Sequence, residues 1–353
     1  MPGLCLVVLF TSAQLDADAL AAGLAEVFGP VPVVGCTTAG EIGPDGYRMG
    51  TVMALGLAAP DFAAETVLLE EVDHPHLTRI ATSARHAVQA VRSAARGLPP
   101  DQMFAFTLFD GLAGGEEVVV SALHNALGEV PLCGGSAGDC LRFARTAVLH
   151  GGRWHDNAAV LVVVATPLPF RVFKTEHFIV DEERVVITGA DPRHRIVTEI
   201  NAEPAAREYA RVVGLDRAPL TPMVFASHPM VVRVGGANFV RSIQKVNDDG
   251  SLTFFCAIDE GIVLRVARGI DLVANLEDLF QDLRDHLGAP VLTLAFDCIL
   301  RGLEMDQTGV RDRVGALLAL NGAFGFATYG EQFQSMHVNQ TFTGVAIGRR
   351  RRE

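Results

Sequence analysis

Thr38-Ala39-Gly40-Glu41 is a four-residue turn that the sequence repeats as Ser136-Ala137-Gly138-Asp139 and Thr328-Tyr329-Gly330-Glu331. Each copy has the order hydroxyl, any residue, glycine, acid. Each also follows the same run of predicted elements: an apolar strand, an amphipathic helix and a second short strand. A supersecondary unit that recurs in this way indicates a fold built by internal duplication. We therefore predict three β-α-β units, each ending in a glycine turn.

The first strand of each unit is a short apolar run, and a helix with apolar side chains at three- and four-residue spacing follows it. The strands are Leu4–Phe10, Met103–Phe109 and Val291–Phe296, and the helices end at Gly29, Gly128 and Asn321. A strand–helix–strand connection joins parallel strands through a right-handed crossover. The glycine turns then lie at the carboxyl ends of strands, where α/β sheets bind their ligands.

Turn residues such as Pro, Asp and Gly separate further apolar runs, and this pattern predicts antiparallel hairpins. The predicted pairs are Thr51–Leu57 with Glu65–Glu70, Thr146–Leu149 with Ala158–Ala165, and Arg241–Val246 with Leu252–Ala257. A helix with Pro204 in its first turn begins after an extended stretch. The predicted fold class is α/β in two domains, residues 1–197 and 198–353, with repeated β-α-β units, glycine turns and inserted antiparallel hairpins.

The composition is that of a folded protein with an acidic surface. Of the 353 residues, 49% are hydrophobic, and the net charge is −12, which disfavours binding to nucleic acid or to an anionic membrane. No apolar run approaches the roughly 20 residues of a membrane-spanning helix. The six cysteines are scattered and form no C-x-x-C pair, as expected in a reducing compartment. We therefore predict a cytoplasmic protein.

Motifs of catalysis are weak in this sequence. None of the turns carries the lysine of a P-loop, and no G-x-G-x-x-G follows a strand. Gly134–Gly138 fits the G-x-S-x-G pattern with Ser136 as nucleophile, and His337 follows in the chain order of a hydrolase. Thr38 and Thr328 occupy the place of Ser136 in the other copies, so the repeat explains the motif without catalysis. We predict that the protein is not an enzyme, with a hydrolase as the alternative.

Two interpretations of the glycine turns stay open. Glycine permits a positive φ and close backbone approach, so the neighbouring hydroxyl and carboxylate could hold a polar ligand. Alternatively, the turn chemistry is structural and recurs because the unit was duplicated. The ligand-turn candidates are Thr38, Gly40, Glu41, Ser136, Gly138, Asp139, Thr328, Gly330 and Glu331.

Two histidines lie in segments that suit a binding site. His177 ends an aromatic-rich extended stretch, and strand alternation places it on the same face as Phe173. An imidazole among phenylalanines, with Arg171 and Lys174 nearby for carboxylates, is the composition of a non-covalent haem site. A structural histidine is the alternative. His337 follows the third glycine turn, where it either lines the same pocket or hydrogen-bonds a strand end.

Several dispersed motifs resemble the FIST family, whose paired N- and C-terminal sensory domains occur in bacterial signalling proteins. The motifs are Val33–Ile42, Cys133–Asp139, Glu199–Ala205 with Tyr209, Asp297–Leu303, and Tyr329–Glu331 with Asn339–Thr341. The resemblance extends over almost the whole chain and keeps the order of the motifs. It implies a sensory input protein.

Two further stretches, Lys174–Phe178 and Gly330–Thr343, are similar to a branch of that family, the nitric-oxide-sensing haemoproteins (NosP type). This resemblance implies a non-covalent haem b and nitric oxide as the signal. The cofactor-binding residues that it implies are His177 as the metal ligand, Phe173, Phe178 and Arg171 around the macrocycle, and His337 and Tyr329 as further candidates.

The resemblance also implies a protein partner. The signal would be reported to a separate histidine kinase of a two-component system or to a cyclic-di-GMP enzyme, with biofilm control as the output. The sequence contains no kinase, receiver or cyclic-di-GMP-synthase segment, so we expect the signal to pass by contact. A homo-oligomer is compatible with the sequence. The alternatives are a haem-free FIST sensor that binds an amino acid or another small polar ligand at the glycine turns, and a scaffold that binds no ligand.

Overall fold

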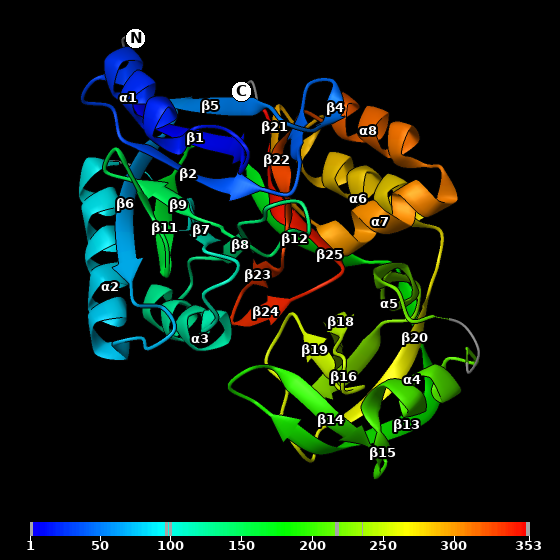
Figure 1. Cartoon of the computed structure of the whole chain (residues 1–353). Helices are drawn as coiled ribbons and strands as arrows, with labels where there is room; N and C mark the ends of the chain where they lie inside the picture. The colour runs from blue at the N-terminus through cyan, green and yellow to red at the C-terminus, as the bar shows by residue number, and fades with distance from the viewer. Residues whose placement is uncertain (1–2, 96–97, 99–100, 216–218, 235, 351–353) are drawn as a thin grey trace.

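The protein consists of a large body of three β-sheets with covering helices and a smaller, β-rich domain inserted into it (Figure 1). The computed structural model describes residues 3–95, 98, 101–215, 219–234 and 236–350. The predicted α/β class is confirmed. No helix among the described residues is long and apolar enough to cross a membrane.

The body is built from three units that share a strand–helix–strand core followed by a hairpin. The first comprises β1 (Leu4–Ser12), α1 (Ala17–Phe28), β2 (Val33–Thr38), β3 (Glu41–Gly43), β4 (Gly46–Arg48) and β5 (Val52–Ala58). The second comprises β6 (Ala63–Glu70), α2 (Leu77–Ala94), β7 (Met103–Phe109), α3 (Glu116–Leu127), β8 (Leu132–Ser136), β9 (Val148–His150), β10 (Arg153–His155) and β11 (Ala158–Ala165). The third comprises β12 (Phe170–Glu176), α6 (Leu272–Leu287), β21 (Leu292–Cys298), α7 (Ile299–Thr308), α8 (Arg311–Leu320), β22 (Ala323–Thr328), β23 (Glu331–Phe333), β24 (Met336–Val338) and β25 (Thr341–Ile347).

Each unit contributes one parallel strand pair and gives its hairpin to a neighbouring unit. β1 with β2, β7 with β8, and β21 with β22 pair in parallel, as a helical crossover requires. The hairpin β3–β4 adds to β22 of the third unit, β9–β10 adds to β2 of the first, and β23–β24 adds to β8 of the second. This cyclic exchange of hairpins joins the three sheets in a pseudo-threefold arrangement.

The three glycine turns meet where the sheets converge and hydrogen-bond to one another through their backbones. The bonds run from Ala39 N to Ala327 O (3.0 Å), from Gly138 N to Thr37 O (3.1 Å) and from Ser136 N to Gly330 O (2.8 Å). Each turn therefore contacts both of the others, and the three form a closed ring. Buried backbone groups need such partners, because an unpaired buried amide is costly.

The inner faces of the three sheets share one apolar core. Phenylalanine rings from all three units stack in series there: Phe10 lies 4.6 Å from Phe326, Phe326 lies 5.7 Å from Phe296, and Phe296 lies 6.5 Å from Phe106, measured between ring centroids. Such aromatic contacts add to the free energy gained by burying the rings. The core therefore depends on all three units together.

Two of the predicted hairpins are wrong. β5 pairs with β1 whereas β6 pairs with β11, so the Pro-containing turn between β5 and β6 carries the chain from one sheet to the next. Likewise β9 pairs with the short strand β10, and β11 pairs with β7 and β6 instead. Turn residues predict a reversal of the chain but do not specify which strand lies beside it.

The inserted domain occupies residues 178–269, between β12 and α6. It comprises β13 (Phe178–Asp191), β14 (Ile196–Ile200), β15 (Glu203–Pro204), α4 (Ala205–Val212), α5 (Pro222–Ser227), β16 (Met230–Val234), β17 (Ala237–Arg241), β18 (Ile243–Val246), β19 (Leu252–Phe254) and β20 (Val263–Gly269). The third predicted hairpin, β18 with β19, is confirmed. The predicted domain boundary near residue 198 falls within β14.

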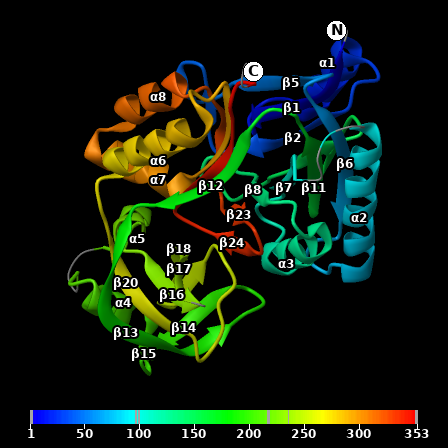
Figure 2. The same ribbon diagram turned by 180° about the vertical axis from the view of Figure 1, so that it is seen from behind.

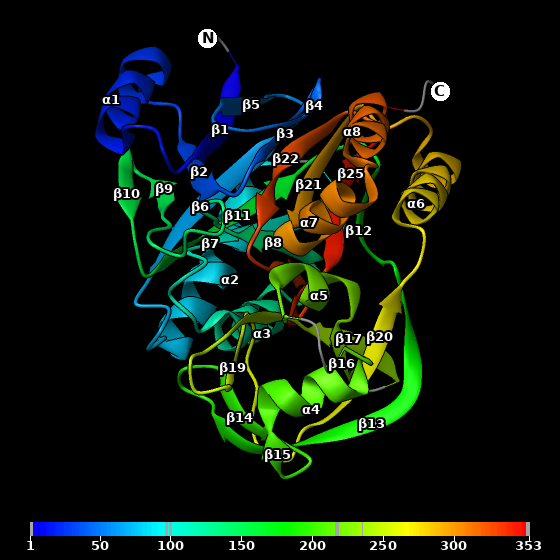
Figure 3. The ribbon, with the colours of Figure 1, turned by 45° about the vertical axis from the view of Figure 1, so that its right-hand side comes forward.

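Helices cover the outer faces of two of the three sheets. Seen from behind, α6, α7 and α8 lie over the third sheet and α2 and α3 lie beside the second (Figure 2). The inserted domain lies below the body, with α5 between the two parts, and the long strand β13 runs down one side (Figure 3). The chain passes from the body into the inserted domain between β12 and β13, and it returns to the body between β20 and α6.

A single added carbon in the ring of turns tests its role in stability. A β-carbon on Gly138 would lie 2.8 Å from Ala39 Cβ and 2.9 Å from Ala39 N. We expect Gly138→Ala to lower the free energy of unfolding by about 1–3 kcal/mol, as for other overpacked sites. Gly23→Ala is the matched control, because nothing lies within 4 Å of its added carbon. Equal urea midpoints for the two variants would contradict this role.

Candidate functional site

The carboxylates of the first and third glycine turns are used within their own units. The Thr38 hydroxyl donates to Glu41, whose other oxygen accepts from Thr51 N (3.1 Å) and Thr51 Oγ1 (2.6 Å). The third turn repeats this arrangement: the Thr328 hydroxyl donates to Glu331, which accepts from Thr341 N (3.2 Å) and Thr341 Oγ1 (2.7 Å). Both carboxylates are fully buried. They hold the turn to the strand that follows it.

The acid of the second turn also acts within the fold. Asp139 accepts hydrogen bonds from three consecutive backbone amides and from the Tyr329 hydroxyl. Burial acts to raise the pKa of Asp139, but these four donors outweigh it and hold the pKa below its usual value. Tyr329 thus links the third turn to the second, packs 5.0 Å from the Phe143 ring and accepts from Leu141 N (2.8 Å).

Ser136 does not form the predicted alternative, a nucleophile activated by histidine. Its Oγ accepts a hydrogen bond from Gln332 Nε2 at 3.0 Å, and the same nitrogen lies 3.4 Å from His337 Nδ1. The amide therefore stands between the hydroxyl and the imidazole. A catalytic serine requires a direct hydrogen bond to its base, and none is formed among the described residues. The geometry of all three turns favours the structural interpretation.

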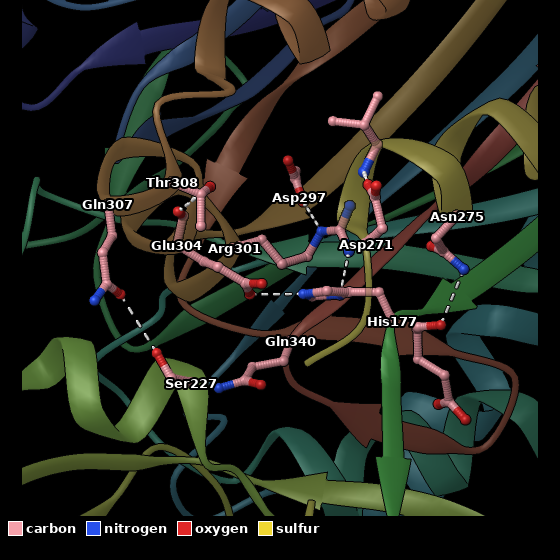
Figure 4. Close-up of polar contacts among 12 residues, drawn as sticks. His177, Ser227, Asp271, Asn275, Asp297, Arg301, Glu304, Gln307, Thr308 and Gln340 are labelled. Atoms are coloured by element: carbon pink, nitrogen blue, oxygen red, sulfur yellow. Dashed lines mark hydrogen bonds and ion pairs between the residues drawn. The ribbon is translucent and has the colours of Figure 1, made fainter. Parts of the chain in front are cut away.

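His177 lies in a buried polar cluster at the start of the inserted domain (Figure 4). Its Nε2 is 2.6 Å from Glu304 Oε2, and its Nδ1 is 2.7 Å from Arg301 Nη1. Arg301 is fully buried and donates from Nε to Asp297 Oδ1 at 2.6 Å, and Asp297 in turn accepts from the Tyr47 hydroxyl. The cluster joins the segment after β12 to α7 through a chain of polar and charged side chains.

The hydrogen bonds of His177 specify its protonation. Burial and then the charge of Arg301 lower its pKa, against the opposing effect of Glu304. A neutral imidazole fits this environment, with Nδ1 accepting from Arg301 and Nε2 donating to Glu304. Both nitrogens are then engaged. An iron ligand needs a free lone pair, so His177 does not fit the predicted role in this arrangement.

The other residues predicted to hold haem do not converge around His177. Phe173 belongs to the core beneath α6, 5.5 Å from the Phe342 ring. Phe178 packs in a separate small cluster of the inserted domain. Arg171 is at the surface, where its guanidinium pairs with Asp282 at 2.9 Å. The three side chains therefore point into different environments, and the set does not form a haem pocket.

His337 lies instead beside a pocket of about 430 Å³ between the body and the inserted domain. We call this the junction pocket. Its lining is Glu117, Ser121, Pro192, Arg241, Ala257, Ile258, Asp259, Ile262, Ser335, Met336 and His337. Glu117 is in the first turn of α3 and His337 is in β24, whereas Arg241 ends β17 and Asp259 follows β19. Both parts of the protein therefore contribute charged side chains to one cavity.

Two residues that line the junction pocket, and Asn339 two positions after His337, have buried polar atoms with no hydrogen-bond partner among the described residues. These atoms are His337 Nε2, Arg241 Nε and Nη1, and both polar side-chain atoms of Asn339. A β-carbon on Gly330 would lie 2.6 Å from His337 Nε2 and 2.9 Å from Asn339 Nδ2, so only glycine allows these side chains to pack against that turn. Buried polar groups are nearly always paired, and unpaired ones call for an explanation.

An ion-pair cluster closes one wall of the junction pocket. Arg195, in the inserted domain, donates to Glu116 (2.7 Å) and Glu117 (3.2 Å) at the start of α3. Glu117 also accepts from Ala257 N at 2.6 Å. Burial raises the pKa of Glu117, but the neighbouring His337, Arg195 and the Ala257 amide together lower it below its usual value. The two parts are therefore held together by charged hydrogen bonds.

Burial lowers the pKa of His337, with opposing contributions from Glu116 and Glu117. The imidazole is therefore neutral near pH 7. With Gln332 Nε2 beside Nδ1, the proton belongs on Nε2. One donor of His337 and two of Arg241 are therefore buried without partners among the described residues, on side chains that line the junction pocket together with Glu117 and Asp259.

Sequence patterns did not point to most of this pocket. His337 was a candidate, but Glu117, Arg195, Arg241 and Asp259 were not, because they belong to segments with no shared motif. The only signal near them was the density of amide and imidazole side chains after the third turn.

A polar pocket at the junction of two parts of a chain is a common place for a small-molecule site. Residues 5–203 match the FIST N domain, and residues 205–334 match the FIST C domain. The chain belongs to the FIST family, whose domains indicate a sensory role in signal transduction rather than a catalytic one. A search of curated proteins finds no match. The family boundary at residues 203–205 lies close to the predicted boundary in sequence, although both fall within the inserted domain.

The buried acid of the third turn makes stability depend on pH. Burial raises the pKa of Glu331 to about 8, despite the hydrogen bonds from Thr328 and Thr341, from an ordinary value of 4.5. A raised folded-state pKa means that this stabilising contribution is complete below about pH 4.5 and is lost as the pH rises to about 8. We expect Glu331→Gln, which stays neutral, to remove part of that loss, on the order of a few kcal/mol.

The measurement is the free energy of unfolding of wild type and Glu331→Gln from pH 5 to pH 8.5. A constant difference between the two proteins across that range would show that Glu331 does not titrate there.

Proposed function

We propose that the protein is a sensor that binds a small polar ligand bearing both a carboxylate and an ammonium group, such as an amino acid, in the junction pocket. The observation that carries the proposal is that Arg241 and His337, which line a pocket of about 430 Å³ together with Glu117 and Asp259, have buried donors without partners among the described residues. This is the haem-free alternative of the sequence analysis, with the site moved from the glycine turns to the junction.

The chemistry of the pocket matches the two charges of such a ligand. The guanidinium of Arg241 has two nitrogens, Nε and Nη1, without partners among the described residues. They lie on opposite sides of the group, so each would donate to a different acceptor atom. The Nε2–H of His337 adds a third donor. Glu117 and Asp259 offer acceptors to an ammonium group. Each unpaired buried donor costs about 1–3 kcal/mol, so a ligand that satisfies these groups recovers that free energy.

A ligand in this position would also couple the two parts of the protein. Arg241 and Asp259 belong to the inserted domain, and Glu117 and His337 belong to the body. A ligand that binds both parts favours the arrangement in which they are closest, and this shifts the population between arrangements. The partner that responds is proposed to be a histidine kinase or a cyclic-di-GMP enzyme in the cytoplasm.

Replacing the guanidinium of Arg241 distinguishes an effect on ligand binding from an effect on the stability of the fold. We expect Arg241→Met to abolish the rise in melting temperature that a panel of amino acids produces in the wild type. Without ligand the variant should be at least as stable as wild type, because it no longer buries unpaired N–H groups. Arg233→Ala is the matched control, since Arg233 is exposed on β16 of the same domain.

The measurement is differential scanning fluorimetry with each amino acid, followed by calorimetry for those that shift the melting temperature. A wild type that responds to none of them, or an Arg241→Met variant that responds as wild type does, contradicts the proposal.

The second candidate is a haem b protein that senses nitric oxide, as the resemblance to the haemoprotein branch implies. The Nε2 of His337 has no partner among the described residues, whereas both nitrogens of His177 are engaged, and this difference favours it. Because the nitrogen is buried against Gly330, a haem would reach it only if that turn moved. Ligation would require the proton of His337 to move to Nδ1, with the Gln332 amide turned to accept it. His337 would then replace His177 as the metal ligand, and nitric oxide binding would be reported to the same class of partner.

The absorption spectrum of protein expressed with added haem decides between the two candidates. If the protein binds haem through His337, we expect His337→Ala to lose the Soret band and His177→Ala to retain it. Colourless wild-type protein would exclude the haem candidate. A Soret band lost only in His177→Ala would show that the hydrogen bonds of His177 are broken in the holoprotein and that His177 is the metal ligand.

A further inference from the structure

The first unit of the body lacks two elements that the other units have. The second unit begins with the strand β6 and the helix α2, and the third begins with the strand β12 and the helix α6. Among the residues that the structure describes, the first unit has no counterpart of either. Its sheet, in the order β10-β9-β2-β1-β5, therefore ends at β5.

The edge of β5 is uncovered where the equivalent strands are enclosed. β11 pairs with β7 on one side and β6 on the other, and β25 pairs with β21 and β12. β5 pairs only with β1 in the described part of the chain. Every residue of β11 and β25 is buried, whereas Leu57 is the one buried residue of β5.

The free backbone groups of β5 can be assigned from its hydrogen bonds to β1. Ser12 N donates to Thr51 O at 3.1 Å, so Thr51 faces β1. Alternate residues of an antiparallel strand face the same neighbour, which places the N–H and C=O groups of Val52, Ala54 and Gly56 on the open side. These three residues are also exposed. The edge thus offers a row of unused donors and acceptors.

The side chains of this edge do not protect it from pairing. Exposed edge strands in soluble proteins usually carry charges, proline or bulges that discourage another strand. Residues 52–58 read Val-Met-Ala-Leu-Gly-Leu-Ala and contain no charge and no proline. Ala54 and Gly56 are small, so a second backbone can approach closely. The strand has the composition of one that is covered in solution.

The helix of the first unit, α1, contacts β10 at the opposite edge of this sheet, where Trp154 Nε1 donates to Ala17 O at 2.8 Å, and it too is poorly covered. α1 has twelve residues, and none of them is buried, although the segment is mostly Ala, Leu, Val and Phe. By comparison, α3 and α6 bury five side chains each. Val27 on α1 is 60% exposed. α1 lies at an outer corner of the body with no second helix next to it (Figures 1 and 3). A helix with so little buried area is stabilised when another surface covers it.

We propose that a second copy of this chain covers the edge, with the two β5 strands paired antiparallel about a twofold axis near Ala54. Antiparallel pairing is the mode by which β6 and β12 cover the equivalent strands. A twofold axis pairs identical edges with each other, so the row of free groups is self-complementary. The two five-stranded sheets then form one continuous sheet, and both α1 helices lie on the same face of it.

The proposal is independent of the junction pocket and is tested by mass. Size-exclusion chromatography with light scattering on the full chain should give twice the chain mass of 37.7 kDa. Ala54→Lys adds a charge at the centre of the edge and should halve that mass without unfolding the protein, as circular dichroism would show. Leu320→Lys is the matched control, because Leu320 is 80% exposed on α8, and it should remain a dimer.

A cross-link locates the interface. Ala54→Cys places two thiols next to the proposed axis, so a short bismaleimide should join them into a covalent dimer, above the background of the wild-type cysteines. A wild type that stays monomeric from micromolar to near-millimolar concentration would overturn the proposal and leave the edge to a strand from another protein. A dimer that persists in Ala54→Lys, with no cross-link at residue 54, would overturn it as well.

Discussion

The ring of backbone hydrogen bonds among the three glycine turns is the constraint on which the rest of the structure depends. It joins three β-α-β units that exchange hairpins cyclically, and it requires each turn to be narrow enough for the next to approach. Glycine supplies that room at Gly138. The acids of the turns act in the same way, because each is bonded to groups of the fold. The hydroxyl, glycine and acid of each turn suggest a ligand site in the sequence, but in the structure they hold the three units together.

The polar groups of the turns are bonded within the fold, so buried polar groups without hydrogen-bond partners elsewhere become the candidates for ligand contacts. The described part of the chain pairs most of its buried charges, as in the series Asp297, Arg301, His177 and Glu304. At the junction pocket, Arg241 and His337 have donors left over. Holding such donors in place costs stability, and a binding function accounts for that cost. Since the pocket is shared by two parts of one chain, a ligand bound there would be coupled to the relative position of the parts.

The local pattern of the sequence predicted much of the fold and little of the site. Apolar periodicity identified the strands beginning at Leu4 and Met103 and the helix that ends at Gly128, because these depend on neighbours in sequence. The pairing partners of several strands were not predictable, because β5 and β6 have the same local pattern whether they pair with each other or belong to different sheets. The pocket was missed for the same reason. Arg241, Glu117 and His337 come together only through the insertion of one domain into the third unit.

Hydrogen–deuterium exchange with and without an amino acid ligand tests most directly the claim that the junction between the two parts is the sensing site. The account predicts slower exchange in two separate segments at once: residues 255–259 of the inserted domain and residues 336–339 of the body. Slower exchange at residues 38–41 and 136–139 alone would place the ligand at the glycine turns and would contradict the account.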